Sequence, residues 1–213
     1  LVWHRYPSDD NPRPIMRPSG KGGFDSYAVF NCAIAIKDGL YYMFYRGENW
    51  DGRWSGGDKG GGSRIGLATN RSLFDGWKKY SDKPIIDNTE WYEQWGGDPT
   101  LGGCEDPRIF KKDDTWYMTY TGYGQAGTPT CIATSKDLIH WTKHGPFCPQ
   151  KNAVILPIKI DGKYWAIYGT ADFGYGWNEG EDLTTGWHWE PADSFMQRTW
   201  DDWRFDQMML ESS

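Results

Sequence analysis

A short aromatic pattern that occurs three times along the chain restricts its fold more than any other feature. Each copy begins with Gly or Asp and continues with aromatic side chains at alternating positions, over residues 39–45, 114–120 and 162–168. Because successive side chains of an extended chain point to opposite faces, each copy predicts a half-buried β-strand that follows a turn. Such strands at a repeating interval indicate a fold made from one unit used several times.

A second pattern follows each aromatic strand. It consists of a short strand of small residues, a polar turn and a tryptophan, over 66–77 and 131–141 and in a weaker form over 178–187. The two patterns together predict an antiparallel sheet of four strands. Arranged radially, several such sheets form a β-propeller, which hides the edges that a single sheet would expose. The predicted fold class is therefore all-β, with a propeller architecture.

The spacing of the copies gives roughly one sheet per fifty to seventy residues, so the chain of 213 residues holds about three to four propeller blades. A ring of three does not close, because propellers have roughly four to eight blades. We therefore expect residues 1–213 to form one propeller domain that is incomplete at its C-terminus, since 208–213 end abruptly in a segment with strand character. The polar, Gly-rich stretches 49–63 and 87–103 are predicted loops, with helical character only near 90–94.

Composition excludes several classes of function. The chain has 23 basic and 29 acidic residues, a net charge of -6, and no Lys or Arg run that could follow a phosphate backbone, so nucleic acid is not an expected partner. No apolar stretch is long enough to span a bilayer, so no membrane partner is expected. The first residues show no secretion pattern and no Met. The compartment of this bacterial-type protein (cytoplasmic, periplasmic or secreted) and its assembly into a homo-oligomer stay open.

The cysteines and histidines do not have the spacing of a metal site. The four cysteines contain no CxxC pair and the four histidines are dispersed, so we expect neither a metal nor another cofactor. Free, mostly buried thiols are expected, with disulfides as the alternative. The 17% share of aromatic residues suits a carbohydrate ligand, because Trp and Tyr stack on sugar rings, although most of them are expected in the core.

The segment 102–109, Gly-Gly-Cys-Glu-Asp-Pro-Arg-Ile, is the strongest candidate for chemistry. It places Glu105, Asp106 and Arg108 just before the second aromatic strand, where the propeller strand nearest the axis would lie. Charged groups in such a place are costly unless they are paired and hydrogen-bonded. The structural alternative is an ion pair in which Arg108 neutralises one of the two carboxylates.

This segment resembles the Glu-Asp-Pro-Arg signature of glycoside hydrolase family 130, a group of five-bladed propellers that contains mannoside phosphorylases and β-1,2-mannosidases. The resemblance extends in the same order over about residues 25–190. It includes Phe30-Asn31-Cys32-Ala33 (with Cys in place of the family's Pro), Phe44-Tyr45-Arg46-Gly47, the segment 63–68, and residues 154–157 with 162–164.

The resemblance implies a role for each matching position. Asp106 would be the general acid that delivers a proton to the glycosidic oxygen, in the phosphorylases through a hydroxyl of the mannose. Asn31 and Arg46 would hold the mannose before the scissile bond. The chemistry agrees, because Arg presents a planar fork of donors and a proton donor needs a carboxyl group whose pKa burial has raised. The further predicted substrate-binding residues are Arg64, Glu105, Arg108, Lys151, Asn152 and Asp172.

The nucleophile separates hydrolysis from phosphorolysis. A phosphorylase binds a doubly charged phosphate, which calls for several fixed cations. The family's phosphorylases carry Arg-Asn and His-Arg-Pro where this chain has Lys151-Asn152 and Tyr168-Gly169-Thr170, so one cation remains as Lys and the other is lost. We therefore predict an inverting hydrolase that cleaves a β-mannoside, with phosphorolysis as the alternative.

An inverting hydrolase also needs a carboxylate that activates water, about 6.5–9.5 Å from the acid. The family's mannosidases use glutamates late in the chain, and Glu211 lies where such a glutamate would fall; Asp172 is a second candidate. The expected partner is a mannoside or another oligosaccharide. Two other classes stay open: a five-bladed glycosidase of the arabinanase or xylosidase type, and a non-catalytic propeller that binds sugars.

Overall fold

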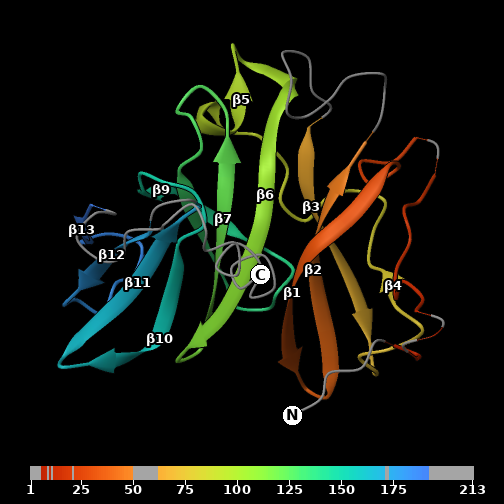
Figure 1. Ribbon diagram of the computed structural model, residues 1–213, viewed down its shortest axis with the longest axis horizontal. Helices are drawn as coiled ribbons and strands as arrows, with labels where there is room; N and C mark the ends of the chain where they lie inside the picture. The colour runs from red at the N-terminus through yellow and green to blue at the C-terminus, as the bar shows by residue number, and fades with distance from the viewer. Residues whose placement is uncertain are drawn as a thin grey trace.

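The computed structural model describes residues 6–8, 10, 12–20, 22–49, 62–170 and 173–191, whose strands form three antiparallel four-stranded units, or blades (Figure 1). One parallel pairing, Ser63 with Gly103, joins the first two blades into a continuous sheet that also includes the short strand β5 (Gln94–Trp95), and the third blade is a separate sheet. Blade 1 consists of β1 (Ala28–Lys37), β2 (Leu40–Glu48), β3 (Ser63–Asn70) and β4 (Lys78–Lys79). Blade 2 consists of β6 (Asp98–Lys112), β7 (Thr115–Tyr123), β8 (Thr130–Ser135) and β9 (Thr142–Cys148). Blade 3 consists of β10 (Val154–Ile160), β11 (Lys163–Gly169), β12 (Phe173–Asn178) and β13 (His188–Glu190). The predicted repeat of four-stranded units is confirmed.

The predicted aromatic strands are β2, β7 and β11, and each follows the first strand of its blade through a two-residue turn. In blades 1 and 3 the turns are Asp38-Gly39 and Asp161-Gly162, and both residues of each turn have a positive φ. This backbone matches the right-handed twist of the flanking strands, which is why Asp-Gly favours a tight hairpin. The turn residues therefore fix the register of β1 with β2 and of β10 with β11.

The predicted turn with a tryptophan closes all three blades in the same way. In each blade the indole Nε1 donates a hydrogen bond to a backbone carbonyl three or four residues earlier in the chain. The weak third copy is thus a structural equivalent of the first two. The pairs are Trp77 with Leu73 (3.3 Å), Trp141 with Leu138 (3.3 Å) and Trp187 with Leu183 (2.9 Å).

Neighbouring blades pack face to face through buried apolar side chains. Between blades 1 and 2, Phe44 lies edge-on to Trp141 with ring centroids 5.6 Å apart, inside a cluster that also contains Ile65, Met118 and Tyr120. A second cluster between blades 2 and 3 contains Tyr117, Ile132 and Tyr164 among its buried members. Because both faces of blade 2 are covered, its middle strands β7 and β8 are buried over most of their length. Strand β6, the first strand of blade 2, contacts the first strands β1 and β10 of the two neighbouring blades, which places these strands nearest the common axis (Figure 1).

The segment between blades 1 and 2 is more ordered than the sequence suggested. Residues 87–103, predicted as a loop, contain a 3-10 helix η1 (Trp91–Glu93), a short strand β5 (Gln94–Trp95) and the start of β6. The carboxylate of Glu93 is fully buried, accepts hydrogen bonds from Tyr120 Oη (2.7 Å) and Lys143 Nζ (2.6 Å), and caps the backbone of Glu90. The helical character predicted near 90–94 corresponds to η1, whereas the order of the rest of the segment was missed because these contacts with blade 2 come from residues distant in the sequence.

The four cysteines, Cys32, Cys104, Cys131 and Cys148, are free, and all but Cys32 are buried, as expected. Within the described part of the chain, no helix is long and apolar enough to cross a bilayer. The same residues contain no group of three or more His, Cys, Asp or Glu side chains arranged to hold a metal ion.

Replacing Lys143 by Met should destabilise the fold strongly. The change leaves the buried Glu93 carboxylate without its cation, which typically costs about 3–5 kcal/mol of unfolding free energy. Urea unfolding measures the effect, with Lys136→Met as the control, since Lys136 is exposed and bonds only the Thr115 hydroxyl among the described contacts. A loss no larger than that of the control would show that Glu93 is not held by this ion pair.

Candidate active site

Two polar side chains lie at matching irregularities of the innermost strands. The register of β1 with β2 shifts between Phe30 and Ala33, and that of β6 with β7 shifts between Glu105 and Arg108. The extra residues include Asn31 and Asp106, whose φ angles of 46° and 51° lie in the left-handed region. Asn and Asp tolerate this conformation better than other non-glycine residues, and bulges of this kind redirect side chains near functional sites. The backbone therefore directs both side chains to one place.

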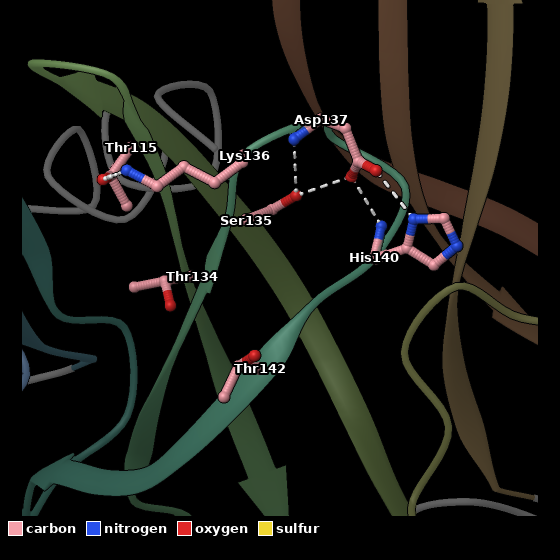
Figure 2. Close-up of a pocket in the computed structure, with 7 residues that line it drawn as sticks. All are labelled: Thr115, Thr134, Ser135, Lys136, Asp137, His140 and Thr142. Atoms are coloured by element: carbon pink, nitrogen blue, oxygen red, sulfur yellow. Dashed lines mark hydrogen bonds and ion pairs between the residues drawn. The ribbon is translucent and has the colours of Figure 1, made fainter.

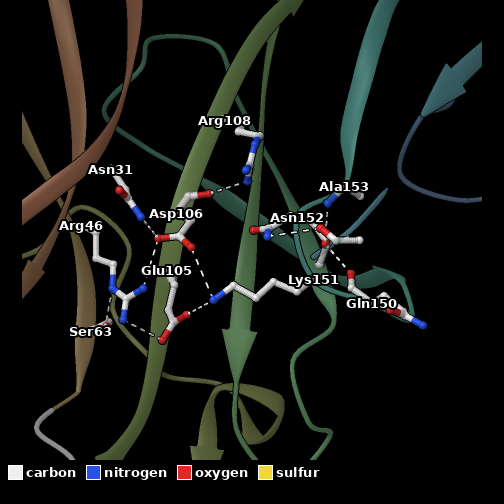
Figure 3. Close-up of polar contacts among 12 residues, drawn as sticks. Asn31, Arg46, Ser63, Glu105, Asp106, Arg108, Gln150, Lys151, Asn152 and Ala153 are labelled. Carbon is white, nitrogen blue, oxygen red and sulfur yellow. Dashed lines mark hydrogen bonds and ion pairs between the residues drawn. The ribbon is translucent and has the colours of Figure 1, made fainter. Parts of the chain in front are cut away.

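The Asp106 carboxylate contacts side chains from β1, from β2 and from the segment that precedes β10 (Figure 3). Its Oδ1 accepts hydrogen bonds from Asn31 Nδ2 at 2.8 Å and Arg46 Nη1 at 3.2 Å. Its Oδ2 lies 3.5 Å from Lys151 Nζ, which comes from the segment that leads into β10. Asp106 is only 6% exposed. The structure thus brings together the predicted acid and the two predicted sugar-binding residues, which come from different blades.

The guanidinium of Arg46 is the centre of the ionic cluster. Besides Asp106, it bonds Glu48 Oε1 at 2.7 Å and Glu105 Oε1 at 3.0 Å. Its Nε donates to Ser63 Oγ at 3.0 Å, and the guanidinium lies over the Phe30 ring at 4.9 Å. All three guanidinium nitrogens therefore donate hydrogen bonds, which fixes the orientation of the Arg46 side chain.

Two members of this cluster, Glu48 and Ser63, were not identified from the sequence. Glu48 lies two residues after Arg46 on β2, so a strand periodicity of two places both on one face. Ser63 pairs directly with Glu48 in the register of β2 with β3, and its hydroxyl donates to Glu48 Oε1 at 3.0 Å. The periodicity was a usable signal for Glu48, whereas Ser63 depends on a strand register that the sequence does not give.

Glu105 and Lys151 complete the cluster. Glu105 is 6% exposed, and its two oxygens bond different cations, Arg46 at 3.0 Å and Lys151 at 2.8 Å. The Lys151 side chain keeps 26% of its surface exposed, more than the other charged groups here. The ammonium of Lys151 is therefore the member of the cluster closest to solvent.

The pKa of Asp106 lies below its ordinary value. Burial alone raises the pKa of this carboxyl, but the charges of Arg46 and Lys151 and the hydrogen bonds from Asn31 and Arg46 lower it by more. The prediction that burial would raise the pKa of the acid was wrong for the free protein, because it did not include two cations that bond the same carboxylate. Asp106 is consequently ionised at neutral pH before a ligand binds.

Arg108 does not neutralise a carboxylate, so the structural alternative proposed for it was wrong. Its Nη1 donates to the backbone carbonyl of Asp106 at 3.3 Å, and burial lowers the pKa of its guanidinium. Its Nε is buried without a hydrogen-bond partner among the described residues, and so is Oδ1 of Asn152, whose Nδ2 bonds the Gly169 carbonyl at 3.4 Å. Figure 3 shows both side chains on the blade 3 side of Asp106. A donor and an acceptor left unpaired in this way suit a polar ligand.

The remaining predicted site residues lie elsewhere or outside the described residues. Arg64 bonds the Asp87 carboxylate and donates to the Ser63 and Pro99 carbonyls, so its described contacts hold the segment between blades 1 and 2. Asp172 and Glu211 fall outside the described residues.

A separate pocket of about 360 Å³ lies on the outer part of blade 2 and does not include the Asp106 cluster (Figure 2). Its polar groups serve the turn between β8 and β9: Ser135 Oγ donates to Asp137, and Asp137 accepts from the backbone of Ile139 and His140. The pocket therefore belongs to the repeated turn that closes each blade.

Comparison with known proteins places the chain in a family. The model of glycoside hydrolase family 130, described as β-1,4-mannooligosaccharide phosphorylase, matches residues 55–191. The chain belongs to glycoside hydrolase family 130. Two curated relatives come from Thermoanaerobacter sp. (strain X514): a 1,2-β-oligomannan phosphorylase, 34% identical over 161 residues (73% of this chain, 51% of the relative), and a β-1,2-mannobiose phosphorylase, 31% identical (71% and 50%). The chain spans about half the length of these family 130 relatives.

A solved structure agrees with the family 130 assignment, and a second, more distant in sequence, agrees in fold alone. One, described as a member of a GH130 family of mannoside phosphorylases that contains glycoside hydrolases targeting β-1,2-mannosidic linkages in Candida mannan, is 28% identical, with a TM-score of 0.65 over 83% of this chain and 52% of that one. A glycosyl hydrolase from Bacteroides ovatus matches with a TM-score of 0.72 at 24% identity, over 89% and 58%. The propeller fold predicted from the repeats is therefore confirmed.

The acidity of Asp106 should depend on Lys151. Replacing Lys151 by Met removes a cation that favours the carboxylate, so the pKa of Asp106 should rise toward its ordinary value or above it. Carboxyl ¹³C NMR titration measures this directly. Lys163→Met is the control, because Lys163 pairs with Glu179 outside the cluster. An Asp106 midpoint that is the same in all three proteins would contradict the assigned cause.

Proposed function

We propose that this family 130 protein cleaves a β-mannoside, with Asp106 as the general acid and water as the nucleophile. The observation that carries the proposal is the buried Asp106 carboxylate, held by Asn31 and Arg46 from blade 1 and by Lys151 from the blade 3 side. A sugar recognised there would meet a carboxylate, an amide and a guanidinium, which are the directional partners that hydroxyl groups require.

The free protein holds Asp106 ionised, so the acid has to gain its proton in the substrate complex. A bound sugar would exclude water from the cluster and strengthen the desolvation that already raises the pKa of Asp106. It would also compete for the donors of Asn31 and Arg46, whose bonds to Asp106 lower that pKa. Both effects favour the protonated carboxyl when substrate is present.

The charge balance around Asp106 favours water over phosphate. Glu48, Glu105 and Asp106 share the cations Arg46 and Lys151. Three carboxylates thus share two cations, so the ion-paired cluster carries a net negative charge and does not attract a dianion. Gly169 stands where the Arg of the phosphorylases' His-Arg-Pro would fall, and Tyr168, in place of the His, donates its hydroxyl to the Glu190 carbonyl at 2.7 Å.

Phosphorolysis is the second candidate, and the names of the relatives favour it. Both Thermoanaerobacter proteins are described as phosphorylases that act on β-1,2-mannosides. Lys151 and Asn152, with its unpaired Oδ1, would be the side chains of this chain nearest an attacking phosphate. For hydrolysis, Glu211 and Asp172 stay the proposed candidates for the base. The substrate proposed for both reactions is a β-mannoside oligosaccharide.

Replacing Asp106 by Asn should lower kcat/KM on β-mannobiose by about 10²–10⁴-fold, the usual contribution of a general acid, with an unchanged melting temperature. The matched control is Asp113→Asn, because Asp113 also has a left-handed backbone, φ 52°, and lies exposed at the far end of the same strand region. Full activity of Asp106→Asn would remove Asp106 from the mechanism. Binding of mannobiose without cleavage by the unaltered protein would instead support a propeller that only binds sugars.

Inorganic phosphate should not stimulate cleavage. The purified protein is incubated with β-1,2- and β-1,4-mannobiose with and without phosphate, and products are identified by chromatography. Mannose as the only new product in both conditions is expected for attack by water. Mannose 1-phosphate formed in proportion to added phosphate would instead establish phosphorolysis.

A further inference from the structure

Strand β6 begins and β7 ends at the same end of the molecule (Figure 1), and two aromatic side chains, Trp95 of β5 and Tyr123 of β7, contact each other beside these strand ends. Trp95 and Tyr123 lie edge to face with ring centroids 5.8 Å apart and an interplanar angle of 70°. Trp95 is 40% exposed, and Tyr123 is partly exposed. We call this pair the aromatic platform.

The strand register places the platform on the same sheet face as Glu105. Gly103 of β6 pairs with Tyr123 of β7, and Glu105 pairs with Thr121. Directly paired residues and residues two apart share one face of a sheet, so Tyr123 and Glu105 project from the same side. Two residues along a strand span about 7 Å, which is short compared with an oligosaccharide. The platform therefore continues the surface that carries the ionic cluster.

The platform is held rigidly although it is exposed. Trp95 lies on the tight hairpin between β5 and β6, in which Gly96 and Gly97 both have positive φ. The preceding residues are anchored by the buried Glu93, and Gln125 N donates to the Gln94 carbonyl at 2.9 Å. At Gly102 a Cβ would lie 2.3 Å from the Glu93 carbonyl oxygen, so the backbones approach too closely for any side chain there. A rigid exposed aromatic surface binds apolar ring faces at little cost in entropy.

We propose that Trp95 and Tyr123 form a distal subsite that stacks on sugar units of a β-mannooligosaccharide, on the leaving-group side of the scissile bond. This inference rests on the proposed function, in which Asp106 is the acid, and on the family resemblance, by which Asn31 and Arg46 hold the sugar before the scissile bond. The remaining units extend away from Asp106, and the face shared by Glu105 and Tyr123 leads them to the platform. The ligand class follows from the surface, since exposed aromatic rings beside hydroxyl-binding charged groups match the apolar ring face and the hydroxyl groups of a pyranose.

The test compares substrates of different length. The purified protein, Trp95→Ala and Tyr123→Ala are assayed on β-1,2- and β-1,4-linked mannooligosaccharides of two to six units. The ratio of kcat/KM for the hexasaccharide to that for the disaccharide should fall about three- to tenfold in each variant, the loss expected for one aromatic stacking contact. Trp91→Ala is the control, because Trp91 is 62% exposed on the same segment but packs against Tyr92.

The outcomes separate this inference from the proposed function. No cleavage of any mannoside by the unaltered protein would overturn the proposed function. The platform is then tested by titrating the hexasaccharide against all four proteins and following binding by calorimetry; weaker binding by Trp95→Ala and Tyr123→Ala only would support it. An unchanged length ratio, an equal change in Trp91→Ala, or equal binding by all four proteins would overturn the platform. Circular dichroism establishes that each variant is folded.

Discussion

The shared guanidinium of Arg46 is the interaction on which the proposed active site depends. It arises from blade 1 and bonds Glu48 of its own strand together with Glu105 and Asp106 of blade 2. Burying one cation among three carboxylates is costly unless the geometry satisfies every group, and ion pairs of this kind often contribute little net stability. The apolar clusters between the blades account for their packing, so the ionic cluster is better explained by chemistry than by folding.

The cluster also determines what Asp106 can do. Burial alone raises the pKa of this carboxyl, but Arg46 and Lys151 lower it by more, and Asn31 adds a hydrogen bond to the same oxygen as Arg46. The left-handed bulges at Asn31 and Asp106 make this convergence geometrically feasible, because a regular strand would alternate the side chains along the sheet instead. The bulges therefore set the position of the Asp106 carboxyl, and burial and the neighbouring charges set its pKa.

Much of this arrangement could be predicted from the sequence because it is repeated or local. The alternating aromatics gave β2, β7 and β11, the tryptophan turns gave the blade ends, and the charged segment 105–108 identified the strand nearest the axis. Contacts set by three-dimensional distances were not predictable. The direction of the Asp106 pKa shift depends on how two cations compare with burial, Ser63 enters the cluster through strand register, and Arg108 bonds a carbonyl instead of a carboxylate. Most of segment 87–103 was mistaken for a loop because its order comes from Tyr120 and Lys143 of blade 2.

The boundary between blades 1 and 2 has a consequence for acidity. Their strands are joined by a single parallel pairing, Ser63 with Gly103, and the groups that hold Asp106 ionised are divided between separate blades. The pKa of Asp106 therefore depends on its distance from Arg46. If blade 1 moved outward by about an ångström, the Coulomb attraction of Arg46 would weaken and the proton affinity of Asp106 would increase. Small rigid-body movements of blade 1 relative to blade 2 would in this way change the acid strength of Asp106.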